Sequence, residues 1–414
     1  MTKITHSSNS LIALWIFSFI TALLFTPSDT GFLIKTLTPL ILTILCLTVF
    51  KFIPEQNRPT LPYLLFFSIS ITSALGLTET LTGSHAHSTN PYLYGLSFYS
   101  ASMAFYLASQ VKLNVNETFR FANPLLLLTG PIALFVKKAG QKTLKRRMNY
   151  YLPFILIGLF FYQIIASPLT NLFFLIEKTD LVSAIIFATI FEIFVYANFC
   201  GLSLIIYGMF GMFGYRIPLN FKQPFSSSNV VDFWKGWHTS LSAVLKVLFY
   251  IPLRKKSTQF FSLSGVFVAS ALWHGVTLNF LIWGIFHAIV FFISLVLLRS
   301  KIKVLPMVIL VFGVIIGRLI FADSDTNRLL EKLMFSYDGM GAFSVLLEAG
   351  NTSKAALILG IGLILIEFFF RKNRYVRKRN YKHLRSPLVL ALLVLIGVLL
   401  ITATGENYAV YGQR

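Results

Sequence analysis

The sequence predicts an all-α integral membrane protein with about 11 transmembrane helices, plus re-entrant or amphipathic helices, around a central tunnel. Three observations lead to this fold class. Hydrophobic residues make up 56% of the 414 residues and charged residues only 12%, whereas an ordinary soluble domain is about 25% charged. The mean hydropathy is +0.74. Apolar runs of about 20 residues, the length that crosses a bilayer, recur along the whole chain.

These apolar runs place the predicted spans at residues 11–26, 32–50, 61–77, 92–111, 151–176, 181–213, 261–274, 278–298, 304–321, 354–370 and 387–403. Basic segments lie between them at residues 137–147, 254–256, 299–303 and 371–385. Each basic segment is separated from the next by two predicted crossings, so all of them fall on the cytoplasmic side, where Lys and Arg concentrate. The sequence therefore predicts a multi-pass protein of the cytoplasmic (inner) cell membrane with its N-terminus inside.

The chain is strongly basic, with 36 Lys and Arg against 15 Asp and Glu and a formal net charge of +21. In a soluble protein this excess would suggest nucleic acid, but here the cations lie between apolar runs and no soluble basic domain carries them. We therefore expect contact with membrane lipids and no nucleic-acid partner. No loop is long enough for a separate domain, so residues 1–414 are predicted to form one membrane-embedded domain. The two cysteines, Cys46 and Cys200, lack the spacing of metal ligands, and no metal site is predicted.

Two histidines stand in tryptophan-rich frames within this apolar chain. His238 lies in V-D-F-W-K-G-W-H-T-S-L-S (231–242), and His274 lies in A-L-W-H-G (271–275). Burying an ionisable side chain in hydrocarbon is costly, so an intramembrane histidine is a functional-site hypothesis. The two frames are therefore the candidate functional region.

The first frame reads as an amphipathic or re-entrant helix. Ser228 or Asn229 can cap its N-terminus, with Asp232 in the first turn. The spacing i, i+3, i+4, i+7 predicts one shared face of Trp234, Trp237, His238 and Leu241. Lys235 and Gly236 are expected to face away from it.

The second frame falls between two apolar halves, residues 261–272 and 278–298. His274 and Gly275 mark the break, which predicts a hairpin whose apex lies inside the membrane. The imidazole of His274 would then lie in the protein interior. His287, further along the second half, is expected to serve packing.

Around the histidines the sequence carries an ordered series of motifs: N-F-K-Q-P-F at 220–225, D-F-W-K-G-W-H-T-S-L-S at 232–242, F-Y-I-P-L at 249–253, L-W-H-G at 272–275 and W-G-I-F-H at 283–287. Two weaker matches lie upstream, G-L-S-F-Y-S at 95–100 and T-G-P at 129–131. In these motifs the chain resembles the membrane-bound O-acyltransferase (MBOAT) superfamily. It is most similar to the bacterial branch that contains the membrane subunits of alginate O-acetylation and teichoic-acid D-alanylation. The resemblance covers about residues 92–325.

The resemblance implies that His274 is the catalytic histidine and His238 the second histidine of the active site. An imidazole can serve as the base that acyl transfer to a hydroxyl requires. Other polar and aromatic residues are expected to line the tunnel and exclude water: Trp234, Trp237, Trp273, Asn279, Trp283 and Asn198. For Asn198 and Glu192, pairing with neighbouring helices is an equal alternative. The basic residues Arg254, Lys255 and Lys256 are expected on the donor side, where they could attract a phosphate-bearing donor or an acidic carrier protein.

The sequence also departs from the family pattern. The family's D-F-S-G-Y-S-D reads N-F-C-G-L-S-L at 198–204, so Asn198 stands where an acid is usual. Gly236 replaces the second arginine of W-R-R-W-H, and I-F-R-A reads I-F-A-D at 320–323, with Arg318 upstream. These changes bear on the identity of the substrate more than on the chemistry.

The first hypothesis is a membrane O-acyltransferase that moves an acyl group, acetyl in the simplest case, from a cytosolic thioester to a hydroxyl of an extracytoplasmic polysaccharide or envelope glycan. No cofactor is expected to stay bound; acetyl-CoA or an acyl carrier protein would be the donor substrate. The resemblance also implies a periplasmic or extracellular SGNH-type transferase as a partner. Two alternatives stay open: D-alanyl transfer to teichoic acid, and a transporter or flippase of a glycan or acyl intermediate without chemistry of its own.

Overall fold

The computed structural model describes residues 8–25, 41, 44–45, 48, 50, 52–74, 123, 125–126, 137–138, 143–176, 180–274, 277–298, 304–322, 334, 341–369 and 386–401. Helices dominate these residues, in agreement with the predicted class. The chain divides into two compact units. The first contains Met1–Ile155, Ile205–Leu219 and Gly412–Arg414, and the second contains Leu156–Leu204 and Asn220–Tyr411. The assignment of one domain to residues 1–414 stays a prediction.

The first unit contains α1 (Ser8–Phe25), the 3-10 helix η1 (Glu55–Thr60), α3 (Leu61–Ala74), most of α8 (Leu144–Leu159) and the end of α10 (Leu181–Met212). It also holds a short antiparallel strand pair that the all-α prediction did not include. Strand β1 (Lys137–Lys138) pairs with β2 (Tyr215–Arg216), with Lys137 opposite Arg216. Tyr207 packs edge-on against Tyr151, with 5.5 Å between the ring centroids.

The second unit contains the remaining elements, all helical. Its first part comprises the π-helical segment η3 (Phe160–Ala166), α9 (Ser167–Leu175) and most of α10. The middle comprises η4 (Pro224–Ser226), α11 (Val230–Gly236), α12 (Thr239–Leu245), the π-helical segment η5 (Lys246–Tyr250) and α13 (Ile251–Arg254). The last part comprises α14 (Gln259–His274), α15 (Leu278–Leu297), α16 (Leu305–Phe321), α18 (Ala342–Glu348), α19 (Asn351–Phe369) and α21 (Pro387–Ile401).

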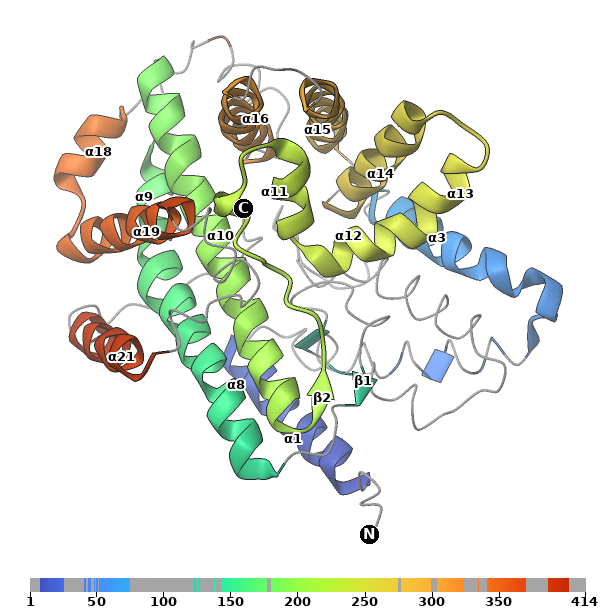
Figure 1. Cartoon of the computed structure of the whole chain (residues 1–414), viewed down its shortest axis with the longest axis horizontal. Coiled ribbons are helices and arrows are strands. Elements are labelled where there is room, and N and C mark those ends of the chain that lie inside the picture. The colour runs from blue at the N-terminus through green and yellow to red at the C-terminus, as the bar shows by residue number, and fades with distance from the viewer. Residues whose placement is uncertain are drawn as a thin grey trace. The chain divides into compact units, whose positions relative to one another are not determined.

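Within the second unit, three consecutive helices form the support of the candidate site. Helix α14 packs along α15, and α15 packs along α16 (Figure 1). The short helix α11 contacts both α15 and α16, and α12 contacts α14. Helix α19, which comes much later in the chain, packs against η4 immediately before α11.

By length and composition, four helical stretches of the described residues could cross a membrane: Leu144–Thr170, Leu181–Met212, Leu278–Leu297 and Asn351–Phe369. They overlap the predicted spans 151–176, 181–213, 278–298 and 354–370, and the shorter apolar helix Leu305–Phe321 overlaps the predicted span 304–321. These helices support a membrane protein. The total of about 11 spans stays a prediction, and the predicted spans at 32–50 and 92–111 lie largely or wholly outside the described residues.

Candidate active site

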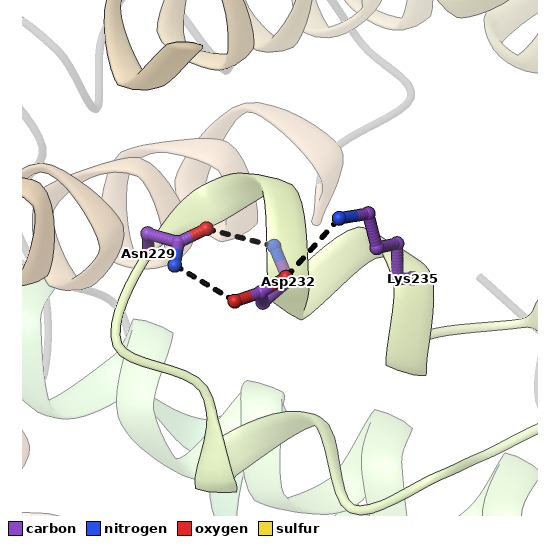
Figure 2. Close-up of polar contacts among 3 residues, drawn as sticks. All are labelled: Asn229, Asp232 and Lys235. Atoms are coloured by element: carbon purple, nitrogen blue, oxygen red, sulfur yellow. Dashed lines mark hydrogen bonds and ion pairs between the residues drawn. The ribbon is translucent and has the colours of Figure 1, made fainter. Parts of the chain in front are cut away.

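The site begins with a capped helix. The side-chain oxygen of Asn229 accepts a hydrogen bond from the Asp232 amide at 2.8 Å, and its amide group donates to Asp232 Oδ2 at 2.9 Å (Figure 2). Asp232 also pairs with exposed Lys235 at 3.2 Å. Such a cap contributes about 1 kcal/mol to the helix. Of the two predicted caps, Ser228 and Asn229, the structure has Asn229, and it confirms Asp232 in the first turn and Lys235 facing away.

The predicted continuous helix is wrong, because the chain breaks immediately after the cap. Helix α11 ends at Gly236, His238 adopts a left-handed backbone with φ of 40°, and α12 begins at Thr239. The preceding loop makes the break: Lys222 N donates to the Gly236 carbonyl at 2.8 Å, and Thr239 N donates to the Asn220 carbonyl at 2.8 Å. These bonds replace the backbone bonds that a continuous helix would form.

Because of this break, the side chains of Trp234, Trp237 and His238 do not share one face, and each contacts different neighbours. Trp234 contacts Phe267, Trp283 and His287, whereas His238 contacts Phe199 and Trp273. Trp237 packs on Tyr196, Phe221 and Phe233.

Gly236 does not face away as predicted. It is buried, and a Cβ there would lie 3.1 Å from the Lys222 carbonyl oxygen and 3.3 Å from Pro224 Cα. The close approach of the loop therefore favours glycine at this position.

His238 is buried among polar and aromatic side chains. Its ring meets Phe199 at 4.6 Å and Trp273 at 5.4 Å between centroids. Nδ1 lies 3.5 Å from Ser240 Oγ, and the Ser240 hydroxyl donates to Asn220 Oδ1. Nε2 has no hydrogen-bond partner among the described residues. Burial, and secondarily the neighbouring His274, lower the pKa of His238 well below its ordinary value of 6.5, so the ring is neutral at physiological pH.

His274 is the last residue of α14, at the predicted break, and α15 begins at Leu278 after the Thr277 cap. Its partly exposed ring lies among aromatic side chains: Trp273 at 4.6 Å, Phe321 at 4.8 Å, Trp283 at 5.3 Å and Phe280 at 5.9 Å. Trp273 therefore contacts both histidines. The structure brings His238 and His274 to one indole, although they are distant in sequence.

A third imidazole, that of His287, packs against two tryptophans of this site. His287 contacts Trp283 at 4.8 Å and Trp234 at 5.1 Å. Its ring fills the space beside Gly317, where a Cβ would lie 2.3 Å from Nε2. Trp283 contacts both His274 and His287. The surroundings of His287 fit the packing role expected for it.

A buried ion pair lies beside these rings. Arg318 was not assigned to the site from sequence, whereas Glu192 was expected either to line the tunnel or to pair with a neighbouring helix. Arg318 Nε donates to Glu192 Oε2. The guanidinium carbon lies 4.9 Å from the centroid of Trp237 and 5.6 Å from that of Phe321. Arg318 is an ionisable residue in an apolar run, which is the same signal that identified the histidines. For Glu192, pairing with another helix is the reading that the structure supports.

A second carboxylate supports the loop before α11. Tyr196 donates its hydroxyl hydrogen bond to Glu367 Oε1, and the Phe225 amide donates to Glu367 Oε2 at 3.2 Å. Glu367 is buried in α19, and Tyr196 also contacts Trp237. The sequence did not predict these two hydrogen bonds, because Tyr196, Phe225 and Glu367 come from three separate segments.

Of the other predicted site residues, the two asparagines are buried and the three basic residues are exposed. Asn198 and Asn279 are buried, at 1% and 0% exposure, and Asn198 precedes the Phe199 that contacts His238. Arg254, Lys255 and Lys256 are exposed at and after the end of α13. The tunnel and the roles of all these residues stay predictions.

Known sequences match this chain over a range that includes both histidines. The model of MBOAT, the membrane-bound O-acyltransferase family, matches residues 10–301, which is more than half of the chain. The peptidoglycan O-acetyltransferase of Helicobacter pylori is 37% identical over 100 residues, covering 23% of this chain and 18% of that protein.

Two other relatives represent two chemistries. A probable alginate O-acetylase of Pseudomonas aeruginosa is 30% identical over 191 residues, covering 44% of this chain and 36% of the relative. The teichoic acid D-alanyltransferase of Bacillus subtilis is 26% identical over 151 residues, covering 33% and 38%. The chain thus spans less than two fifths of the length of each of these curated relatives.

Proposed function

The chain belongs to the membrane-bound O-acyltransferase family, and from this premise we propose that it is a membrane enzyme that transfers an acyl group from a thioester to a hydroxyl of an envelope glycan. The acyl group is acetyl in this proposal, because the names of two relatives are those of O-acetylating enzymes of glycans. The donor is acetyl-CoA or an acyl carrier protein, and the site of the protein is the cytoplasmic membrane. An SGNH-type protein outside the membrane is the proposed partner in this modification.

One observation carries the proposal: the two histidines meet at Trp273 inside an aromatic shell. His274 keeps part of its surface exposed, whereas His238 is 3% exposed. We assign His274 as the base that contacts the reacting groups, and His238 as the residue that orients them. The aromatic shell limits water, which would otherwise hydrolyse the thioester.

The reaction balances on these residues. His274 takes the proton of the acceptor hydroxyl as the oxygen attacks the thioester carbon, and the carbonyl electron pair moves to its oxygen. The tetrahedral intermediate then collapses and expels the thiolate, which takes the proton back from His274. The products are an acyl ester of the glycan and a free thiol.

The hydrogen bonds of Ser240 favour one proton arrangement of His238. The Ser240 hydroxyl gives its one proton to Asn220, so it can meet His238 Nδ1 only as an acceptor. This favours the tautomer protonated at Nδ1 and leaves the lone pair on Nε2, which has no described protein partner. Nε2 is therefore suited to accept a hydrogen bond from a substrate hydroxyl.

The first test replaces His274 with Ala and measures glycan acylation in cells by mass spectrometry. We expect a loss of about 10²- to 10⁴-fold, the usual contribution of general acid–base catalysis, with the protein still present in the membrane. His287→Gln is the matched control, because it removes another imidazole of the same aromatic group and should lose far less. Wild-type acylation in His274→Ala would refute the proposal and favour a transporter, which does not need this base.

D-alanyl transfer is the second candidate, supported by the match to the Bacillus subtilis D-alanyltransferase. The same spectra discriminate, because an acetyl ester and a D-alanyl ester add different masses to the glycan. Detection of D-alanyl esters that vanish in His274→Ala would retain the catalytic assignment and replace acetyl as the transferred group.

A further inference from the structure

A buried ion pair next to the histidines calls for an explanation beyond stability. Glu192 is 4% exposed and Arg318 is 8% exposed. Removing two such charges from water has a large free-energy cost, and replacing a buried pair by apolar residues is often neutral or stabilising. The pair is therefore a poor device for holding α10 and α16 together.

The geometry of the pair leaves part of the guanidinium free for another task. Arginine and carboxylate commonly form two parallel hydrogen bonds. Here Arg318 uses Nε toward Glu192 Oε2, while Glu192 Oε1 has no hydrogen-bond partner among the described residues. The contact is therefore one-sided. The two terminal amino groups of Arg318 carry four further N–H donors that this single bond does not use.

The surroundings of the guanidinium belong to the proposed reaction site. The guanidinium lies against Trp237 and Phe321. Phe321 is one turn after Arg318 on α16, and its ring meets the His274 ring at 4.8 Å. Trp237 directly precedes His238. Arg318 thus contacts one ring that packs on His274, that of Phe321, and one ring that is next to His238 in sequence, that of Trp237.

We propose that Arg318 is a catalytic residue of the acyl transfer, whose terminal amino groups hydrogen-bond the carbonyl oxygen of the acyl donor, and that Glu192 positions it through Nε. This inference rests on the proposed function. When the acceptor oxygen attacks the thioester carbon, the carbonyl π electrons move to the oxygen, and Arg318 binds the resulting negative charge. The charge returns to the carbonyl as the carbon–sulfur bond breaks, so Arg318 neither gains nor loses a proton.

The decisive variant removes both charges at once. R318M/E192M replaces the pair with apolar side chains, which leaves no unpaired buried charge. We expect normal protein levels in the membrane and an unchanged melting temperature in detergent. Glycan acylation should fall about 10²- to 10³-fold, the usual effect of losing an oxyanion-binding group.

A second double variant, R318E/E192R, keeps an ion pair but moves the cation to α10. It guards against failure of the first variant to fold. If the pair only stabilises the fold, either folded variant should acylate within about threefold of wild type, and this outcome overturns the proposal. In membranes that turn over acetyl-CoA, the kcat should fall with little change in the KM for acetyl-CoA.

His274→Ala separates this inference from the proposed function. An inactive His274→Ala together with an active R318M/E192M refutes only the role of Arg318. Wild-type acylation in His274→Ala refutes the proposed function, whatever the arginine variants do.

Discussion

The backbone at His238 shows how the site is assembled at the scale of single residues. A left-handed conformation is uncommon for a residue other than glycine and has a free-energy cost of about 1 kcal/mol or more. Asn220 and Lys222 hold the turn through two backbone hydrogen bonds, each 2.8 Å long. The strained turn places the His238 ring between Phe199 and Trp273.

The titration of His238 leads to a prediction about stability. Its folded pKa lies well below 6.5 because of burial, whereas in the unfolded chain it returns to about 6.5. Below that pH the unfolded state binds a proton that the folded state does not, so the free energy of unfolding falls as pH falls. His238→Asn should flatten this dependence, and asparagine tolerates the left-handed backbone.

Melting temperatures of the two proteins in detergent between about pH 8 and pH 5.5 test this sign. His274 and His287 are present in both proteins, so the difference between the two slopes reports on position 238. Equal slopes would mean that His238 is not a neutral, buried imidazole in the folded state.

At this scale the sequence singled out histidines and tryptophans, several of which are in contact in the structure, but it did not predict their directions. His238, Trp273 and His274 stand out because such residues are rare in apolar sequence. The turn at His238 depends on hydrogen bonds from Asn220 and Lys222, which helical spacing does not reveal. Arg318 and Glu192 pair across a long sequence separation, so neither frame pointed to them.

At the scale of elements, the close approach of α8 and η3 to α10 depends on a glycine. A Cβ on Gly201 would lie 2.7 Å from the Gly158 carbonyl oxygen and 2.9 Å from the Tyr162 amide nitrogen. Both neighbours are backbone atoms in helices and cannot move independently. Gly201 therefore allows the helices to pack at a distance that other residues forbid.

Gly201→Ala should destabilise the protein by about 1–3 kcal/mol, the usual range for overpacking. Gly362→Ala is the matched control, because Gly362 also lies in a helix and has nothing within 4 Å of its ideal Cβ position. That substitution should be neutral or stabilising, since alanine favours helix over glycine. Thermal unfolding in detergent compares the two, and equal melting temperatures would contradict the packing argument.

Hydropathy along the sequence predicted the positions of the long helices well. The predicted span 181–213 corresponds to α10, and the break at His274 corresponds to the end of α14. The short β1–β2 pair and the separation of α11 from α12 were not predicted, because both are set by contacts between distant segments. Apolar periodicity reports on burial along one helix and not on such pairings.

At the scale of the whole molecule, the exposed positive charge contrasts with the aromatic surroundings of the two histidines. The net charge of +21 is large, whereas the residues around the histidines are mostly aromatic. Arg254, Lys255 and Lys256 are exposed shortly before α14, the helix that begins at Gln259 and ends at His274. One helix thus connects the basic segment with the proposed base. A negatively charged donor attracted to the segment would be concentrated at the start of the helix that ends at His274.

This arrangement predicts a binding effect without a catalytic one. Replacing Arg254, Lys255 and Lys256 with Gln should raise the KM for acetyl-CoA while leaving kcat unchanged, because the three cations attract the donor but do not touch the reacting atoms. The KM of wild type should also rise with salt more steeply than that of the triple variant, since salt screens exposed charges. Lys235→Gln is the control, because Lys235 is exposed but belongs to the Asp232 pair on α11. A lower kcat with an unchanged KM would instead place these cations in the chemical step. Unchanged kinetics would mean that the basic segment contacts the lipid surface and does not attract the donor.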